Sequence, residues 1–215
     1  MEQRTLTVKG TGQASLPPDT IQLDFDLESK AENYDETINL AGTRLEQLRS
    51  CLANVGFSKS DLVTTNFSVN TDYESVKNEE GEYIRVFKGY SVRNNLKLSF
   101  PIDTHRLAMI LEQLSACEAN PELSIHFLLT DDTKLKELLL QDAVADATQK
   151  ANILALAAGV RLDDILAITY DWSNIVYRNR EMMLEESVAY SAAAIDIQPD
   201  NVSASDTVTI VWEIK

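Results

Sequence analysis

Three carboxylates occur at every second position of one short segment, at Asp24, Asp26 and Glu28. In an extended strand this spacing places all three side chains on the same face. Carboxylates grouped in this way can bind a cation or a basic partner, or act as a general acid and base. The same spacing is typical of the solvated face of a half-buried strand, and this is the interpretation we adopt. We therefore predict an acidic face without a catalytic role.

The other residue types that do chemistry are few and scattered. His105 and His126 are the two histidines of the chain, and neither has a cysteine or a carboxylate at a metal-ligand spacing. Gly10-Thr11-Gly12 lacks the third glycine and the lysine of a phosphate-binding loop, so we interpret it as a bulge or turn between strands. Nothing in the sequence resembles a nucleophile elbow. We therefore assign no catalytic residue, no cofactor and no metal site.

The two cysteines, Cys51 and Cys117, lie in predicted helices and lack the CxxC spacing of a redox or zinc motif. Buried free cysteines behave as small hydrophobic residues. Two buried thiols are the first interpretation, and a disulfide between them is the alternative.

The overall charge limits the classes of partner. The chain of 215 residues carries 34 acidic and 19 basic side chains, a net charge of −15, which repels phosphate backbones and anionic membranes. The longest apolar stretch, residues 153–160, is far shorter than the roughly 20 residues of a membrane-spanning helix. We expect neither a nucleic acid partner nor a transmembrane segment.

The start of the chain leaves two possibilities for its location. Met1-Glu2-Gln3-Arg4 leads directly into strand-like sequence, without the apolar core of a signal peptide. The chain as it stands is expected in the cytoplasm, and in the periplasm or cell envelope if an export signal has been removed.

Hydrophobic periodicity defines the elements that carry these residues. Ile21, Leu23, Phe25 and Leu27 alternate with polar residues and predict a strand with one core face. Apolar residues at helical spacing follow, and Gly56 ends that helix. Further strands are predicted around 63–73, 92–100, 123–129, 166–172 and 208–214, with a hairpin connection at 74–82, a short helix from Asp103 and a long helix that ends at Gly159.

Small residues recur at helical spacing in the last of these helices, at Ala143, Ala147, Ala151 and Ala155. Their size allows close approach to a sheet or a neighbouring helix, so we expect them to pack. Trp172 and Trp212 lie at core-facing positions of predicted strands, so we expect both side chains in the core.

The two halves of the chain match each other. Phe25 aligns with Phe127 at a separation of 102, and Gly56 aligns with Gly159 at a separation of 103. Such self-similarity indicates a duplicated unit. We predict an α+β fold of internally duplicated βαββ units, with an antiparallel sheet packed against two long helices. The first lobe is 1–101, and the second lobe, 102–215, carries an extra short helix; the two pack together.

Several short motifs occur in a defined order along the chain. They are Thr7-Val8-Lys9-Gly10-Thr11-Gly12, Pro18-Asp19, Gly89-Tyr90-Ser91-Val92, Asp146-Ala147-Thr148-Gln149-Lys150-Ala151 and Ala158-Gly159-Val160. Their order and spacing, over nearly the whole chain, resemble those of the SIMPL-domain family (domain of unknown function 541). The resemblance implies a bacterial α+β protein, often exported to the cell envelope, without an established enzymatic activity. It carries over no catalytic residue.

An apolar segment near the C-terminus is the candidate surface for assembly. Residues 178–199 form a long connection that is too apolar for a solvated tail. We predict that it is an arm that contacts another subunit, through Met182, Met183, Leu184, Val188 and Tyr190. The alternative is an extended hairpin folded back over its own lobe.

These observations predict a non-enzymatic binding or assembly module that self-associates or binds another protein. The alternative is an enzyme or a small-molecule carrier that uses a cleft between the lobes. An enzyme would require titratable groups with perturbed pKa values in the cleft. A carrier would require a sizeable apolar pocket with a few polar groups.

Overall fold

The computed structural model describes residues 4–77, 81–170, 175–178, 182–183 and 198–215. The chain divides into two compact units, each assembled from separate stretches of sequence. Unit 1 comprises Met1–Asp19, Phe127–Arg180 and Pro199–Lys215, and unit 2 comprises Thr20–His126 and Glu181–Gln198. The lobes 1–101 and 102–215 divide the chain differently and remain a hypothesis about its duplication.

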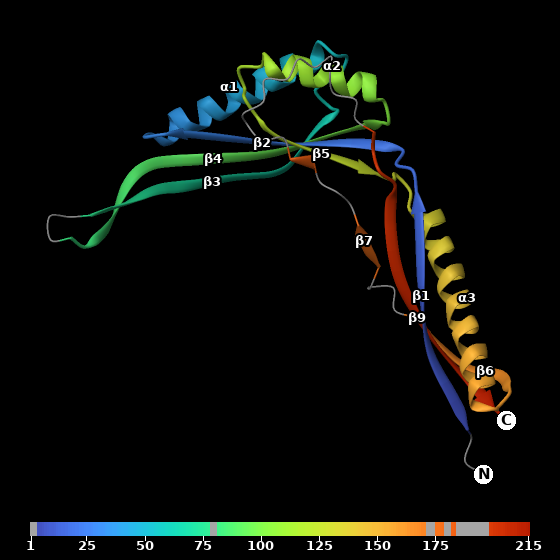
Figure 1. Ribbon diagram of the computed structural model, residues 1–215. Coiled ribbons are helices and arrows are strands. Elements are labelled where there is room, and N and C mark those ends of the chain that lie inside the picture. Colours follow the sequence, from blue (N-terminus) through green and yellow to red (C-terminus); the bar gives the residue numbers. More distant parts are fainter. Residues whose placement is uncertain (1–3, 78–80, 171–174, 179–181, 184–197) are drawn as a thin grey trace. The chain divides into compact units, whose positions relative to one another are not determined.

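Unit 1 is built on a four-stranded antiparallel sheet. The sheet has the order β1 (Thr5–Leu16), β9 (Val202–Ile214) and β6 (Leu162–Tyr170), and the short β7 (Val176–Arg178) also pairs with β9. The pairing of β1 with β9 is continuous from Thr5 opposite Glu213 to Leu16 opposite Val202. The helix α3 (Thr133–Ala158) packs along β1 and β9 (Figure 1).

The close approach of α3 to β1 depends on small residues in both elements. Ala143, Ala147 and Ala151 are buried against the sheet, as their spacing predicts. A Cβ atom added at Gly10 would lie 2.7 Å from the Cβ of Ala147, and one at Gly12 would lie 3.0 Å from the Cβ of Ala143. The interpretation of these glycines as a bulge or turn is therefore wrong. They lie within a continuous strand, where a missing side chain admits the helix.

Unit 2 contains the longer strands and two helices. Its five-stranded sheet has the order β3 (Leu62–Lys77), β4 (Tyr83–Pro101), β2 (Thr20–Ala31), β5 (Glu122–Leu128) and β8 (Met182–Met183). The helices α1 (Tyr34–Ala53) and α2 (Thr104–Ser115) lie on one face of this sheet (Figure 1). Ile21, Leu23 and Phe25 are buried beneath them, which confirms the predicted core face of β2.

The predicted arrangement of the fold is wrong, although its class, α+β, is confirmed. In place of an antiparallel sheet packed against two long helices, the described residues form three helices and two separate antiparallel sheets. The strand before α3, β5, pairs in the sheet of unit 2, and β1 lies beside β9 instead. The error arises because the pairing of β1 with β9 joins the two ends of the chain and leaves no local pattern in the sequence.

Candidate functional site

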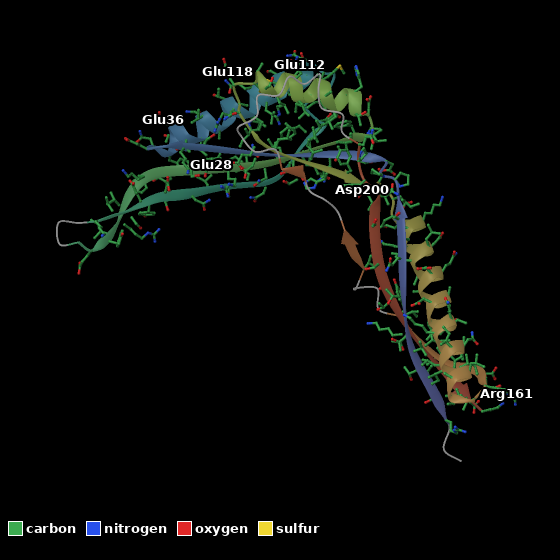
Figure 2. All side chains as sticks on the ribbon, in the orientation of Figure 1. Glu28, Glu36, Glu112, Glu118, Arg161 and Asp200 are labelled. Carbon is green, nitrogen blue, oxygen red and sulfur yellow. A yellow bond between two sulfur atoms is a disulfide. The ribbon has the colours of Figure 1, made fainter. Side chains whose placement is uncertain are left out.

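The acidic residues of β2 lie on the face of the sheet opposite α1 and α2, because they alternate with the buried residues. The Oδ2 atom of Asp24 lies 3.1 Å from Nε2 of His126 on β5. Arg93 on β4 approaches Asp26 at 3.4 Å and Glu28 at 3.5 Å; Figure 2 labels Glu28. The three acidic side chains retain exposed fractions of 39%, 27% and 41%. They form a paired polar surface and not a set of free carboxylates.

A recess of about 470 Å³ opens on this face. It is lined by Asp24, Phe25, Asp26, Thr65, Asn66, Asn95, Leu96, Glu122 and Ser124. A bulge between Thr64 and Asn66 brings two polar side chains beside Asn95. Thr65 Oγ1 donates to the backbone carbonyl of Asn95 at 3.1 Å, and Asn66 Nδ2 donates to Oδ1 of Asn95 at 3.3 Å. The Oδ1 atom of Asp26 is buried without a hydrogen-bond partner among the described residues. The recess therefore has a largely polar lining.

The structure supports no metal site within the part of the chain that it describes. No group of three or more His, Cys, Asp or Glu side chains there could hold a metal ion. His105 is an exposed residue of α2, and His126 pairs with Asp24 as described above.

Cys51 and Cys117 form a disulfide, with their Cα atoms 6.2 Å apart, so the interpretation as two buried thiols is wrong. Cys51 lies in the last turns of α1, and Cys117 follows the end of α2. The bond therefore ties the two helices of unit 2 together. The sequence supports this disulfide only as the alternative, because 66 residues separate the cysteines and no local spacing links them. Lasting disulfides of this kind occur mainly in oxidising compartments.

The sequence did not single out the outer part of the β3–β4 hairpin as a site. β2 pairs with β4 only as far as Tyr90. Beyond it, within the described residues, β3 and β4 pair only with each other, from Asp72 opposite Gly89 to Lys77 opposite Tyr83. The hairpin extends past the start of α1 (Figure 1). We call residues 72–77 and 83–89 the ribbon.

The ribbon exposes several large apolar side chains. Their exposed fractions are 72% for Tyr83, 47% for Phe87, 46% for Ile84, 44% for Tyr73, 40% for Val76 and 38% for Val86. The register places Tyr73, Tyr83 and Phe87 on one face of the ribbon and Val76, Ile84 and Val86 on the other. An isolated two-stranded hairpin is marginally stable in water, and exposed apolar side chains in such number mark interaction sites. The signal that could have revealed the ribbon is the apolar sequence of 83–87 beside a region with no predicted helix to cover it.

Four aromatic rings connect the ribbon to the first turn of α1. Tyr34 contacts Tyr90 at a centroid distance of 5.5 Å, Tyr90 contacts Phe87 at 5.5 Å, and Phe87 contacts Tyr73 at 5.7 Å, all edge to face. The guanidinium of Arg85 lies 4.7 Å from the centroid of the Tyr73 ring. Such contacts are favourable beyond the area that they bury. They hold the exposed rings in a fixed arrangement.

A bulge and a glycine mark the base of the ribbon. The register of β3 against β4 shifts between Asp72 and Tyr73. Gly89 has a φ of 143°, and a Cβ atom added there would lie 2.8 Å from the Cα of Glu32. Nearby, the ammonium of Lys88 lies 2.7 Å from Glu74, and this hydrogen bond raises the pKa of Lys88 above its usual value. The direction in which the ribbon leaves the sheet is therefore fixed locally.

The predicted arm is described only in part. The backbone of Met182 and Met183 pairs with Ile125 and Ser124 of β5. Leu184, Val188 and Tyr190 lie outside the described residues. The contact of these five residues with another subunit therefore remains a prediction.

The comparisons with known proteins agree with the resemblance in the sequence. No helix among the described residues has the length and apolar character needed to cross a membrane. None of the curated proteins matches the chain. The family model "SIMPL: Protein of unknown function (DUF541)" matches residues 6–212. Because the match covers nearly all of the sequence, the chain belongs to the SIMPL family.

Proposed function

We propose that this chain is a non-enzymatic binding and assembly module that acts through protein–protein contact. The observation that carries the proposal is the ribbon, where six large apolar side chains are at least 38% exposed. Scattered apolar residues are common on protein surfaces, but three large apolar side chains on each face of a two-stranded hairpin are not. A partner that covers these side chains would supply the apolar contact that the ribbon lacks.

Self-association is part of the proposal. Two surfaces are candidates for it: the ribbon, supported by its exposed rings, and the apolar arm that includes Met182, Met183, Leu184, Val188 and Tyr190, supported by its sequence. Both segments contain several large apolar side chains, so hydrophobic contact would contribute at either of them.

The disulfide supports a location in the cell envelope. The bond between Cys51 and Cys117 would be reduced in most bacterial cytoplasms, whereas it would persist in the periplasm. Such a location agrees with the export that is frequent in the family.

A small-molecule carrier is the second candidate, favoured by the recess beside β2. Its volume of about 470 Å³ is within the range of ligand sites. The side chains of Asp24, Asn66 and Asn95 in its lining offer hydrogen bonds to a polar ligand. The polar lining favours a polar ligand over the apolar cargo of a typical carrier.

Site-specific photo-crosslinking in living cells tests the proposal. A photoreactive residue replaces Tyr83 on the ribbon, and in a control variant it replaces Gln149, an exposed polar residue of α3. The expected result is a discrete covalent adduct at position 83 and none at position 149, with the partner identified by mass spectrometry. A further variant with the photoreactive residue at Tyr190 examines the arm. Absence of an adduct at both 83 and 190 would contradict the proposal.

A further inference from the structure

We propose that the disulfide between Cys51 and Cys117 is a site of thiol–disulfide exchange, which an external thiol reaches through Cys51. The reaction involves no residue of the ribbon, and it adds a chemical role to the structural role of the bond. The reaction partner is a dithiol oxidoreductase, a protein that exchanges a pair of neighbouring cysteines with the disulfides of other proteins.

The two cysteines of the disulfide differ in their access to solvent. Cys117 is buried, with an exposed fraction of 7%, whereas Cys51 is only partly buried. Cys51 lines a recess of about 710 Å³ that runs along the C-terminal half of α1 to the residues that follow α2. Cys117 is not among the residues of the described chain that line it. A thiolate that attacks a disulfide needs access to one of the two sulfur atoms, and here the recess leads to Cys51.

The exchange proceeds through a mixed disulfide. A thiolate of the oxidoreductase attacks Sγ of Cys51, the bond to Cys117 breaks, and its electron pair leaves on Sγ of Cys117, which takes up a proton from water. The second thiolate of the oxidoreductase then attacks its own neighbour's sulfur in the mixed disulfide and releases Cys51, which is protonated in turn. The oxidoreductase is oxidised to a disulfide, and this chain is reduced by two electrons. The reverse sequence forms the bond.

A backbone acceptor is already in place for the sulfur that leaves. Sγ of Cys117 lies 3.8 Å from the carbonyl oxygen of Gln47, and a thiol is a weak hydrogen-bond donor. The reduced Cys117 therefore has a hydrogen-bond partner inside the protein, as buried polar groups generally do. The released Cys51 remains at the recess, where it can attack an oxidised oxidoreductase in the reverse direction.

The charges around the recess select the kind of thiol that enters it. Two carboxylates, those of Glu46 and Glu118, belong to its lining. Glu46 is paired with Arg49 and with Lys59, each at 2.6 Å. Glu118 accepts a hydrogen bond of 3.0 Å from the amide of Gln47 and has no ion pair among the described residues. Its negative charge repels an anionic thiolate, so an oxidoreductase with positive charge beside its attacking cysteine fits this site best.

Reaction of the folded, oxidised full chain with small thiols tests the inference. The chain is incubated with cysteamine, the reaction is stopped with acid, and free thiols are alkylated in denaturant. Peptide mass spectrometry should find the cysteamine adduct on Cys51 at least roughly tenfold more often than on Cys117, because access decides which sulfur is attacked. The rate of reduction should rise in proportion to the thiol concentration.

A second thiol of opposite charge tests the role of Glu118. Cationic cysteamine should react faster than anionic 2-mercaptoethanesulfonate, relative to their rates with a small uncharged disulfide. Glu118→Gln should reduce this preference by roughly fivefold, the effect of about one unit charge at close range in water. Glu36→Gln is the matched control, because Glu36 is an exposed residue in the first turn of α1, outside the recess. It should leave the preference unchanged. Figure 2 labels both residues.

Three results would overturn the inference: adducts found mainly on Cys117, a rate of reduction that is independent of thiol concentration, or an unchanged preference in Glu118→Gln. A concentration-independent rate would mean that the thiol reacts only after the chain unfolds, and the bond would then be structural alone. None of these results bears on the ribbon, so the crosslinking experiment still decides the proposed function separately.

Discussion

The two units cover their sheets to different extents. In unit 1, α3 has 26 residues and β9 has 13, which correspond to about 39 Å of helix and about 43 Å of strand. In unit 2, α1 has 20 residues and β4 has 19, or about 30 Å of helix beside about 63 Å of strand. The helix matches its sheet in unit 1, whereas in unit 2 seven of the 19 residues of β4, Tyr83–Gly89, lie beyond the pairing with β2. These residues form one strand of the ribbon.

The two units also differ in how the helix contacts the sheet. In unit 1, alanines of α3 lie directly over Gly10 and Gly12 of β1, and close packing of small residues holds the layers together. In unit 2, large side chains such as Phe25 fill the space under α1 and α2, and a disulfide links the two helices. The comparison indicates that unit 1 is specialised for compact packing, whereas unit 2 combines a bulky core with an exposed extension.

The largest expected effect is the loss of a core ring from unit 2. Phe25→Ala should lower the free energy of unfolding by about 3–5 kcal/mol, because the ring is 1% exposed and its removal leaves a cavity. Asp24→Ala, on the opposite face of the same strand, should cost less than about 1 kcal/mol because its pair with His126 is partly exposed. Urea unfolding followed by circular dichroism measures both. Equal losses of unfolding free energy in the two variants would contradict the assignment of Phe25 to the buried face and Asp24 to the exposed face of β2.

Removal of the disulfide should be the next largest effect. The free energy of unfolding of the double variant Cys51→Ser and Cys117→Ser should be lower by about 2–5 kcal/mol, because the disulfide of the wild type closes a loop of 66 residues. Thermal melting with and without a reductant gives the measurement. The reductant should lower the melting temperature of the wild type and leave that of the double variant unchanged. A wild type that is insensitive to a strong reductant under unfolding conditions would argue against the bond.

Adding a single methyl group at the helix–sheet contact of unit 1 should lower the free energy of unfolding by about 1–3 kcal/mol. Gly10→Ala places a Cβ 2.7 Å from the Cβ of Ala147, so α3 has to move away from β1. Gly42→Ala in α1 is the matched control, because no atom lies within 4 Å of its added Cβ, and it should stabilise the helix by up to about 1 kcal/mol. Chemical denaturation of the two variants should therefore give shifts of opposite sign. Shifts of the same sign would remove the distinction between the two helices.

The smallest expected effect is a pH dependence in unit 1. The hydrogen bond from Lys150, with a second one from the backbone N–H of Thr11, lowers the pKa of Asp146. A depressed pKa means that the ionised carboxylate stabilises the folded state above its unfolded pKa, and that this contribution is lost as the pH falls through the folded pKa. Asp146→Asn should therefore be less stable than the wild type near pH 7, and the difference should shrink in acid. Thermal melts of the wild type and Asp146→Asn at several pH values measure this convergence, and a difference that stays constant in acid would contradict it.

Local features of this fold could be predicted from the sequence. The buried face of β2 follows from alternation, and the ends of two helices follow from cap residues: Asp103 accepts a hydrogen bond from the backbone N–H of Arg106 at 2.9 Å, and Gly159 has a φ of 69°. These features depend on residues within a few positions of each other. The division into two sheets could not be predicted, because it depends on pairing between the first and last strands.

The candidate site was predicted less well than the fold, for a physical reason. Alternating apolar residues look the same in a buried strand and in an exposed ribbon, so the apolar residues of 83–87 do not by themselves show that α1 fails to cover them. The acidic residues Asp24, Asp26 and Glu28 were found because their charge marks one face directly. Their pairing with His126 and Arg93 depends on neighbouring strands, which no spacing within β2 reveals.

Hydrogen–deuterium exchange of the wild-type chain at two concentrations tests the central claim most directly. If the uncovered ribbon of unit 2 is the contact surface, the exchange of its peptides, residues 72–77 and 83–89, should slow as the concentration rises. Peptides of α3 should exchange at the same rate in both samples, because unit 1 already covers its own sheet. Ribbon peptides that exchange at the same rate at both concentrations, or slowing in α3 alone, would contradict the account.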